Sequence, residues 1–136
     1  MGRILGIDYG AKRCGIAVTD PLQISINPLK VVEPENMLTF LETYLKSEVV
    51  ETLAIGWPTH SDGKETYLTK QITTFLSNFA KLFPNIRIVK VDESFTSSEA
   101  KTLIFNSGAK KKKRKEKSLV DQISAVLIIK RYLEDI

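Results

Sequence analysis

Two apolar segments separated by a short turn stand near the start of the chain, and no other feature constrains its fold as strongly. The first segment ends at Asp8, the turn contains Gly10, and the second segment begins at Cys14. This pattern predicts an antiparallel β-hairpin with a carboxylate beside its turn. Gly10 can adopt the positive φ that many tight turns require, because it has no Cβ.

Two cations lie in the same turn. Lys12 and Arg13 follow Gly10 directly after Ala11, close in sequence to Asp8. Charged side chains of this kind hold phosphate groups by charge-assisted hydrogen bonds. The segment is therefore consistent with a phosphate or metal site, and also with an ordinary solvated hairpin turn.

Strand and helix patterns alternate along the rest of the chain. Strands are predicted at about residues 23–32, 52–56 and 86–91, and helices at about residues 34–47, 68–83, 96–106 and 118–133. Pro28 lies in the first of these strands, which places that strand at an edge of the sheet or at a bulge. This order of elements predicts one α/β domain over residues 1–136, a mixed sheet flanked by helices.

Composition excludes several classes of protein. The longest apolar stretch, about residues 125–129, is far shorter than the roughly 20 residues of a membrane span. The first residues enter a strand without a secretion signal, so we expect a cytoplasmic location and no membrane contact. Cys14 is expected to be a buried structural thiol, and the lone His60 has no partner for a zinc site.

Positive charge is concentrated in one short segment. The net charge is +4, yet residues 110–117 hold seven basic residues and one acid, which leaves 13 basic and 15 acidic residues elsewhere. Such a segment is typical of a nucleic-acid contact, and a solvated loop or a localisation signal has the same composition. The candidate substrate-binding residues in it are Lys110, Lys111, Lys112, Lys113 and Arg114.

Three acidic residues lie where secondary-structure elements begin or end. Asp8 and Glu93 stand at the ends of predicted strands, and Asp121 stands in the first turn of the predicted last helix, where the helix dipole also favours an acid. If these ends meet at one edge of the sheet, the carboxylates could share Mg²⁺ or Mn²⁺, which prefer oxygen ligands. Such a site can hydrolyse a phosphodiester without a protein nucleophile. The sequence leaves open whether the three acids converge.

Four ordered motifs resemble the YqgF (RuvX) family of Holliday-junction-resolvase-like nucleases, and together they cover nearly the whole chain. They read Asp8-Tyr9-Gly10-Ala11-Lys12-Arg13-Cys14-Gly15-Ile16-Ala17 with Thr19-Asp20, Gly56-Trp57-Pro58 with Asp62-Gly63, Asp92-Glu93-Ser94-Phe95-Thr96-Ser97, and Asp121-Gln122-Ile123-Ser124-Ala125-Val126-Leu127-Ile128.

The resemblance implies an RNase H-like fold with a mixed five-stranded sheet, and Asp8, Glu93 and Asp121 as the metal-binding catalytic acids. It also implies processing of the 5′ end of pre-16S ribosomal RNA during ribosome biogenesis, with structured RNA and the pre-ribosomal particle as partners. Lys12 and Arg13 match the basic pair of the family, for which we infer phosphate contact.

This chain departs from the family pattern at two positions. Trp57 stands where the family usually has leucine, and Ser94 stands where it usually has arginine. The missing arginine removes one possible phosphate clamp, and the lysine-rich segment is our candidate to compensate for it.

Other functions fit parts of the pattern. A Holliday-junction resolvase acting on branched DNA would keep the same chemistry, and a stable dimer would favour it. A non-catalytic nucleic-acid-binding factor would keep the acids as fold elements only. An actin-like or sugar-kinase ATPase also has an Asp and a Gly in its first hairpin, but it needs two lobes, and 136 residues are too few for them.

Overall fold

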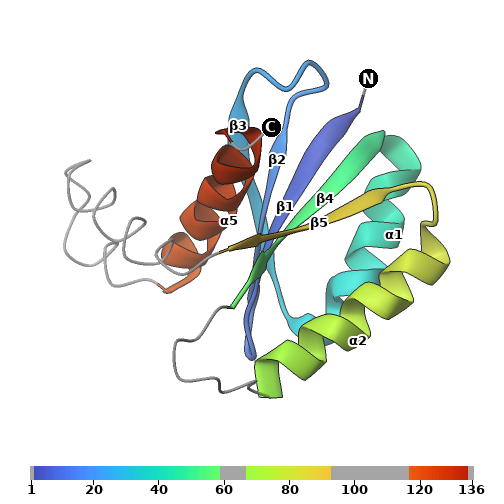
Figure 1. The fold of residues 1–136 in the computed structure, drawn as a ribbon, viewed down its shortest axis with the longest axis vertical. Coiled ribbons are helices and arrows are strands. Elements are labelled where there is room, and N and C mark those ends of the chain that lie inside the picture. Colours follow the sequence, from blue (N-terminus) through green and yellow to red (C-terminus); the bar gives the residue numbers. More distant parts are fainter. Residues whose placement is uncertain (1, 59–66, 93–116, 135–136) are drawn as a thin grey trace.

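The computed structural model describes residues 2–58, 67–92 and 117–134, with no description of the side chains of residues 117–119. In chain order the elements are β1 (Arg3–Tyr9), β2 (Cys14–Thr19), β3 (Ile26–Val32), the short 3-10 helix η1 (Pro34–Asn36), α1 (Met37–Ser47), β4 (Val50–Trp57), α2 (Tyr67–Leu82), β5 (Arg87–Asp92) and α5 (Lys117–Glu134) (Figure 1). The predicted helix at residues 96–106, the lone His60 and residues 110–116 of the lysine-rich segment lie outside the described residues.

The sheet has five strands in the order β3-β2-β1-β4-β5. β1 pairs antiparallel with β2, which confirms the predicted hairpin, and β2 pairs antiparallel with β3. β1, β4 and β5 are parallel, so their carboxyl ends, at Tyr9, Trp57 and Asp92, meet at the same edge of the sheet. The prediction of a mixed sheet is therefore confirmed.

β3 is an edge strand with an irregular register, as its proline predicted. Ile16 of β2 pairs with Lys30, but the next residue, Ala17, pairs with Pro28. The pairing skips one residue because proline has no amide hydrogen to donate to the ladder.

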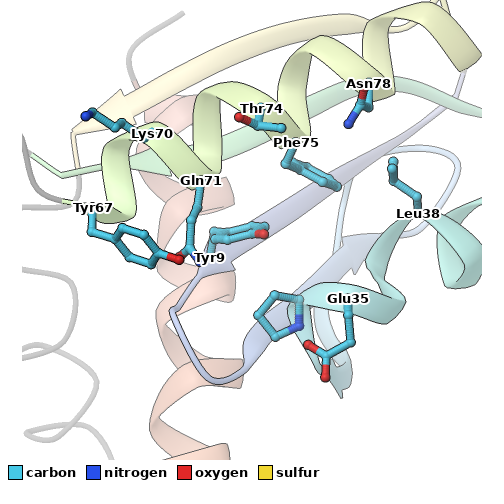
Figure 2. Close-up of a pocket in the computed structure, with 10 residues that line it drawn as sticks. Tyr9, Glu35, Leu38, Tyr67, Lys70, Gln71, Thr74, Phe75 and Asn78 are labelled. Carbon is cyan, nitrogen blue, oxygen red and sulfur yellow. The ribbon is translucent and has the colours of Figure 1, made fainter.

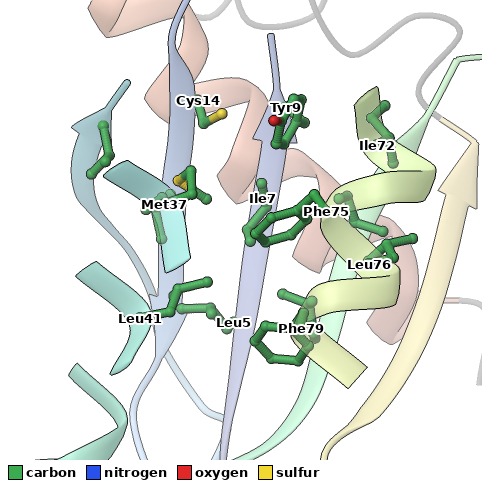
Figure 3. Close-up of a cluster of buried hydrophobic side chains, with 14 of the residues drawn as sticks. Leu5, Ile7, Tyr9, Cys14, Met37, Leu41, Ile72, Phe75, Leu76 and Phe79 are labelled. Carbon is green, nitrogen blue, oxygen red and sulfur yellow. The ribbon is translucent and has the colours of Figure 1, made fainter. Parts of the chain in front are cut away.

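One face of the sheet packs against α1 and α2. Alternate residues of β1, such as Leu5 and Ile7, are fully buried beneath Leu41 of α1 and Phe79 of α2 (Figure 3). Complete burial of one side chain of this size contributes about 1.5–3 kcal/mol. Phe75 and Phe79 of α2 are thus core residues.

Among the elements that the structure describes, α5 covers the other face. Ile4, Ala17 and Ala54 of the sheet form a second cluster with Ala125 and Ile129 of the helix. The two clusters lie on opposite faces because side chains alternate along each strand. None of the helices in the described ranges is long and apolar enough to cross a membrane.

Two glycines let the α5 backbone approach the sheet. A Cβ added at Gly15 of β2 would lie 2.1 Å from the carbonyl oxygen of Asp121, and one at Gly6 of β1 would lie 2.8 Å from that of Ala125. Side-chain carbons essentially never approach backbone oxygens so closely. The helix can therefore rest at this height only because both strand positions lack a side chain.

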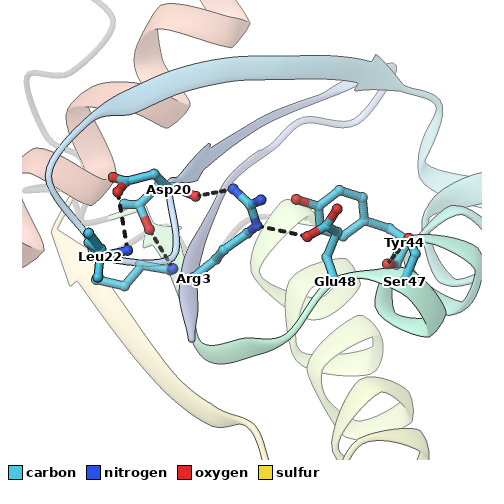
Figure 4. Close-up of polar contacts among 8 residues, drawn as sticks. Arg3, Asp20, Leu22, Tyr44, Ser47 and Glu48 are labelled. Atoms are coloured by element: carbon cyan, nitrogen blue, oxygen red, sulfur yellow. Dashed lines mark hydrogen bonds and ion pairs between the residues drawn. The ribbon is translucent and has the colours of Figure 1, made fainter. Parts of the chain in front are cut away.

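Polar contacts close the sheet end opposite to the strand ends described above. Arg3 donates from Nε to Glu48 (3.0 Å) and from Nη1 to the carbonyl oxygen of Thr19 (3.0 Å) (Figure 4). Asp20 accepts backbone N–H bonds from Leu22, Ile24 and Ser25 in the β2–β3 loop. These bonds, that of Ser25 first, hold the pKa of Asp20 below its usual value.

Substitution of Gly15 by alanine is expected to destabilise the protein by about 1–3 kcal/mol or more, because the new methyl group must displace the α5 backbone. Denaturant unfolding followed by circular dichroism measures this change. Ala80→Ser, on the exposed side of α2, is the control and should shift stability by less than about 0.5 kcal/mol. An unchanged unfolding midpoint for Gly15→Ala would contradict the close approach of α5.

Candidate active site

Asp8 lies on the face of the sheet that α5 covers. In β1, Ile4 and Gly6 face α5 and Leu5 and Ile7 face the opposite core, so the alternation places Asp8 on the α5 side. Its side chain is half-buried, and its ladder partner in β2 is Gly15.

Gly15 also marks where Asp121 meets the sheet. The carbonyl of Asp121 rests against the Gly15 backbone, the same residue that pairs with Asp8. The fold thus brings together two of the three predicted acids, although 112 positions separate them in sequence. Both carboxylates act on the Cys14 thiol next to Gly15. The pKa of this thiol is raised to about 12, mainly by burial and also by the charges of Asp8 and Asp121.

The position of Asp121 differs from the prediction in one respect. The helix begins at Lys117, so Asp121 lies in its second turn, and the first turn of α5 contains no acidic residue. The helix dipole favours acids chiefly in the first turn. It therefore does not account for an acid at this position.

Arg13 forms an ion pair with Asp121. Its Nε lies 3.0 Å from Oδ2 of the carboxylate, and the two side chains are 35% and 25% exposed. The contact joins the β1–β2 turn to α5 and places a cation directly at the candidate site. The other predicted phosphate-binding residue of this turn, Lys12, is exposed to solvent.

The β1–β2 turn does not use the positive φ that Gly10 permits. The φ of this glycine does not lie in the left-handed region. What the turn requires is space, since a Cβ at Gly10 would lie 2.4 Å from the carbonyl oxygen of Arg13. Cys14 is buried as predicted.

The end of β5 is tied to α5. Nη1 of Arg131 donates to the backbone oxygen of Asp92 at 2.6 Å, and Asp92 pairs in register with Trp57 of β4. Nζ of Lys90 lies 4.0 Å from the centre of the Trp57 ring, so the tryptophan that departs from the family pattern makes a cation–π contact. Glu93 follows Asp92 in the sequence but lies outside the described residues, as do Lys110, Lys111, Lys112, Lys113 and Arg114.

The described residues supply two carboxylates to a possible metal site. No group of three or more acidic, histidine or cysteine side chains within these ranges is placed to hold a metal ion. The donor chemistry fits a hard cation, because both groups are carboxylates, and the Arg13 contact shows that positive charge is accommodated beside Asp121.

A cleft of about 450 Å³ lies on the opposite face of the sheet, at the same end of β1 (Figure 2). Tyr9 forms part of its wall, next to Glu35 of η1 and several side chains of α2. The sequence did not indicate this cleft, because its lining residues come from three separate segments and follow no spacing motif.

The chain matches a known protein family and is similar to named proteins over nearly its whole length. The profile of a protein family described as "RuvX: Holliday junction resolvase" matches residues 2–135. The chain is 43% identical over 133 residues to a protein of Amoebophilus asiaticus named "Putative pre-16S rRNA nuclease", covering 98% of this chain and 94% of that protein. A protein of the same name from Porphyromonas gingivalis is 44% identical over 135 residues, covering 99% and 98% of the two chains.

Among solved structures, the chain resembles Thermus thermophilus RuvC in complex with a Holliday junction substrate, with a TM-score of 0.62, 14% sequence identity, and coverage of 99% of this chain and 96% of that one. A second structure of Thermus thermophilus RuvC gives a TM-score of 0.56 at 15% identity, with coverage of 98% and 96%. These similarities confirm the predicted RNase H-like fold.

Cys14 is expected to resist alkylation in the folded protein. At a pH of about 8, a thiol with a pKa near 12 is about 0.01% thiolate, which is the reactive form, and the side chain is fully buried. Reaction with iodoacetamide should therefore be at least about 100-fold slower than in denaturing urea. Cys14 is the single cysteine, so mass spectrometry of the intact chain reports on it alone. Equal rates in both conditions would contradict its burial.

Proposed function

The chain belongs to the RuvX family of Holliday junction resolvases, and from this premise we propose that it is a metal-dependent nuclease that processes the 5′ end of pre-16S ribosomal RNA. The proposal treats residues 1–136 as one RNase H-like nuclease domain that acts in the cytoplasm on structured RNA within the pre-ribosomal particle. The family supports a nuclease, and the names of relatives that match over almost their full length support the RNA substrate.

The observation that carries this proposal is the meeting of Asp8 and Asp121 at Gly15. The two residues meet there through their backbones, and acidic residues gathered at one point of a sheet repel each other unless a cation lies between or beside them. A structural role alone does not require two acids at this point. Their proximity is what a site for a divalent cation requires.

We assign Glu93 as the third acid. It follows Asp92 in the sequence, at the end of a strand whose Val89 and Val91 belong to the cluster beneath α5. The contact between Arg131 and the Asp92 backbone supports a fixed position for this strand end relative to α5. Three carboxylates at one strand edge suit Mg²⁺ or Mn²⁺.

The protein groups divide the work of the reaction. Bound metal ions would supply an activated water and would neutralise charge on the phosphodiester. Asp8, Glu93 and Asp121 would hold those ions. Arg13 and Lys12, on the turn beside Asp8, would contact the phosphate backbone and orient it, since a guanidinium binds phosphate oxygens as readily as carboxylate oxygens.

Substitution of Asp8 by asparagine is expected to reduce cleavage of an end-labelled pre-16S rRNA fragment by about 100-fold or more in Mg²⁺ or Mn²⁺, because the variant loses a charged metal ligand. EDTA should abolish cleavage by the unmodified protein. Glu42→Gln, on the exposed side of α1, is the matched control and should cleave at the normal rate.

A four-way DNA junction tested in the same assay separates the alternatives. Selective cutting of the junction would replace the RNA proposal by that of a resolvase. Binding of both substrates without cutting of either would show a non-catalytic binding factor and would overturn the nuclease proposal.

We also propose that the lysine-rich segment binds the RNA backbone. Replacing Lys110, Lys111, Lys112 and Lys113 by serine should weaken RNA binding and reduce the salt dependence of log K by about 3, at about 0.7 for each lost phosphate contact. Fluorescence anisotropy at several salt concentrations measures both quantities. Serine at the exposed Lys30, Lys46, Lys81 and Lys130 is the charge-matched control. Equal effects of the two substitutions would contradict a specific role for the segment.

A further inference from the structure

The cleft on the α1 and α2 face opens at the same strand end as the candidate active site. Asp8 and Tyr9 are consecutive residues of β1, so their side chains point to opposite faces of the sheet. Asp8 lies on the α5 side with Asp121, and Tyr9 faces the cleft. A nucleic-acid strand that crosses this edge of the sheet can therefore reach both sites.

The floor and mouth of the cleft are aromatic. Tyr9 and Phe75 are buried, with ring centres 5.4 Å apart and ring planes tilted by 42°. Tyr67, in the first turn of α2, is 75% exposed and stands at the rim (Figure 2). Nucleic-acid-binding proteins use such rings to stack against unpaired bases.

Hydrogen-bonding groups accompany these rings. Oε1 of Gln71 is buried in the cleft wall and has no hydrogen-bond partner among the described residues. A buried amide oxygen without a partner requires a donor to offset its lost hydration. Glu35 supplies a second acceptor from η1, across the cleft from α2 (Figure 2).

The balance of charge and volume narrows the class of ligand. Glu35 and Lys70 are the charged residues among those that line the cleft in the described part of the chain, and they have opposite signs. A phosphate group would find no excess of positive charge there. A volume of about 450 Å³ lies within the range of small-molecule sites and accommodates a flat heterocycle.

We propose that this cleft binds an unpaired base of the RNA close to the cleaved bond, an inference that rests on the proposed nuclease function. The acceptors of Gln71 and Glu35 select a base that carries an exocyclic amino group over uracil. Cytosine and uracil are the most informative pair, because they have the same size but different donors. Cytosine has an amino group with two N–H donors at C4, whereas uracil has a single N3–H donor between two carbonyl oxygens, which would repel the two acceptors.

Nucleotide titration in EDTA tests the base preference without cleavage. Full-length ¹⁵N-labelled protein is titrated with CMP and, separately, with UMP, and amide shifts are followed by NMR. CMP should give saturable shifts in residues 67–78 and at Glu35, with binding about 5-fold tighter than that of UMP, the factor expected from one hydrogen bond. Gln71→Met, of similar volume, should remove the preference. Lys81→Ala, on the same helix but away from the cleft, should retain it.

Several outcomes would overturn the inference. They are equal binding of the two nucleotides, shifts confined to the Asp8 side of the sheet, an unchanged preference in Gln71→Met, and shifts of the cleft residues that depend on protein concentration alone. The last would show that a second copy of the chain occupies the cleft.

A second measurement ties the cleft to the RNA. The affinity of Asp8→Asn protein for precursor fragments is measured in EDTA, with one nucleotide at a time made abasic. One position should lose about 5-fold in affinity, and the loss should be absent in the Asp8→Asn, Gln71→Met double variant. If no abasic position lost affinity, the inference would be overturned even if the RNA is cleaved. A base preference in a protein that cuts no RNA would instead contradict only the nuclease proposal.

Discussion

The backbone contact between α5 and Gly15 is the constraint on which the candidate site depends. It sets the height of the helix above the sheet, and it sets which residue of α5 lies beside the turn of the hairpin. A side chain at this position would lift the helix and move the Asp121 carboxylate away from Asp8. Gly6 allows α5 to approach the sheet in the same way further along the helix, where Ala125 and Ile129 lie against it. Stability and site geometry therefore rest on the same pair of glycines.

The ends of the parallel strands determine where functional side chains can lie close together. β1, β4 and β5 all end at one edge, whereas the opposite end is closed by the contacts of Arg3 and Asp20. Open α/β sheets generally bind ligands beyond the carboxyl ends of their strands. In this protein the end of β1 contributes a residue to each face of the sheet. Asp8 lies on the α5 side, and Tyr9 lies in the wall of the cleft. A single strand end thus links two regions that lie on different layers of the molecule.

Sequence pattern predicted the elements well and their contacts less well. Two apolar segments and the turn between them identified the hairpin, and Pro28 identified the edge strand. The resemblance to a family made Asp8 and Asp121 candidate site residues, but no local pattern shows that Gly15 receives a helix backbone from more than 100 residues away. Gly10 does not use the positive φ that glycine permits: contact with the Arg13 carbonyl, and not backbone conformation, requires glycine there. The cleft depends on side chains from β1, η1 and α2 together, so it could be found only in three dimensions.

The ion pair between Arg13 and Asp121 joins the two sides of the acid site without adding much to stability. Both side chains are partly exposed, and pairs of this kind contribute about 0–1 kcal/mol to folding. The close packing at Gly15 already fixes the backbone of Asp121, so that backbone keeps its place whether or not Arg13 contacts the carboxylate. Replacing the Arg13 guanidinium by another cation would therefore change the free energy of unfolding little. Backbone packing at Gly15 sets the position of Asp121, whereas Arg13 is held there only by a surface ion pair. The cation beside Asp121 can therefore change without any rearrangement of the sheet or the helix.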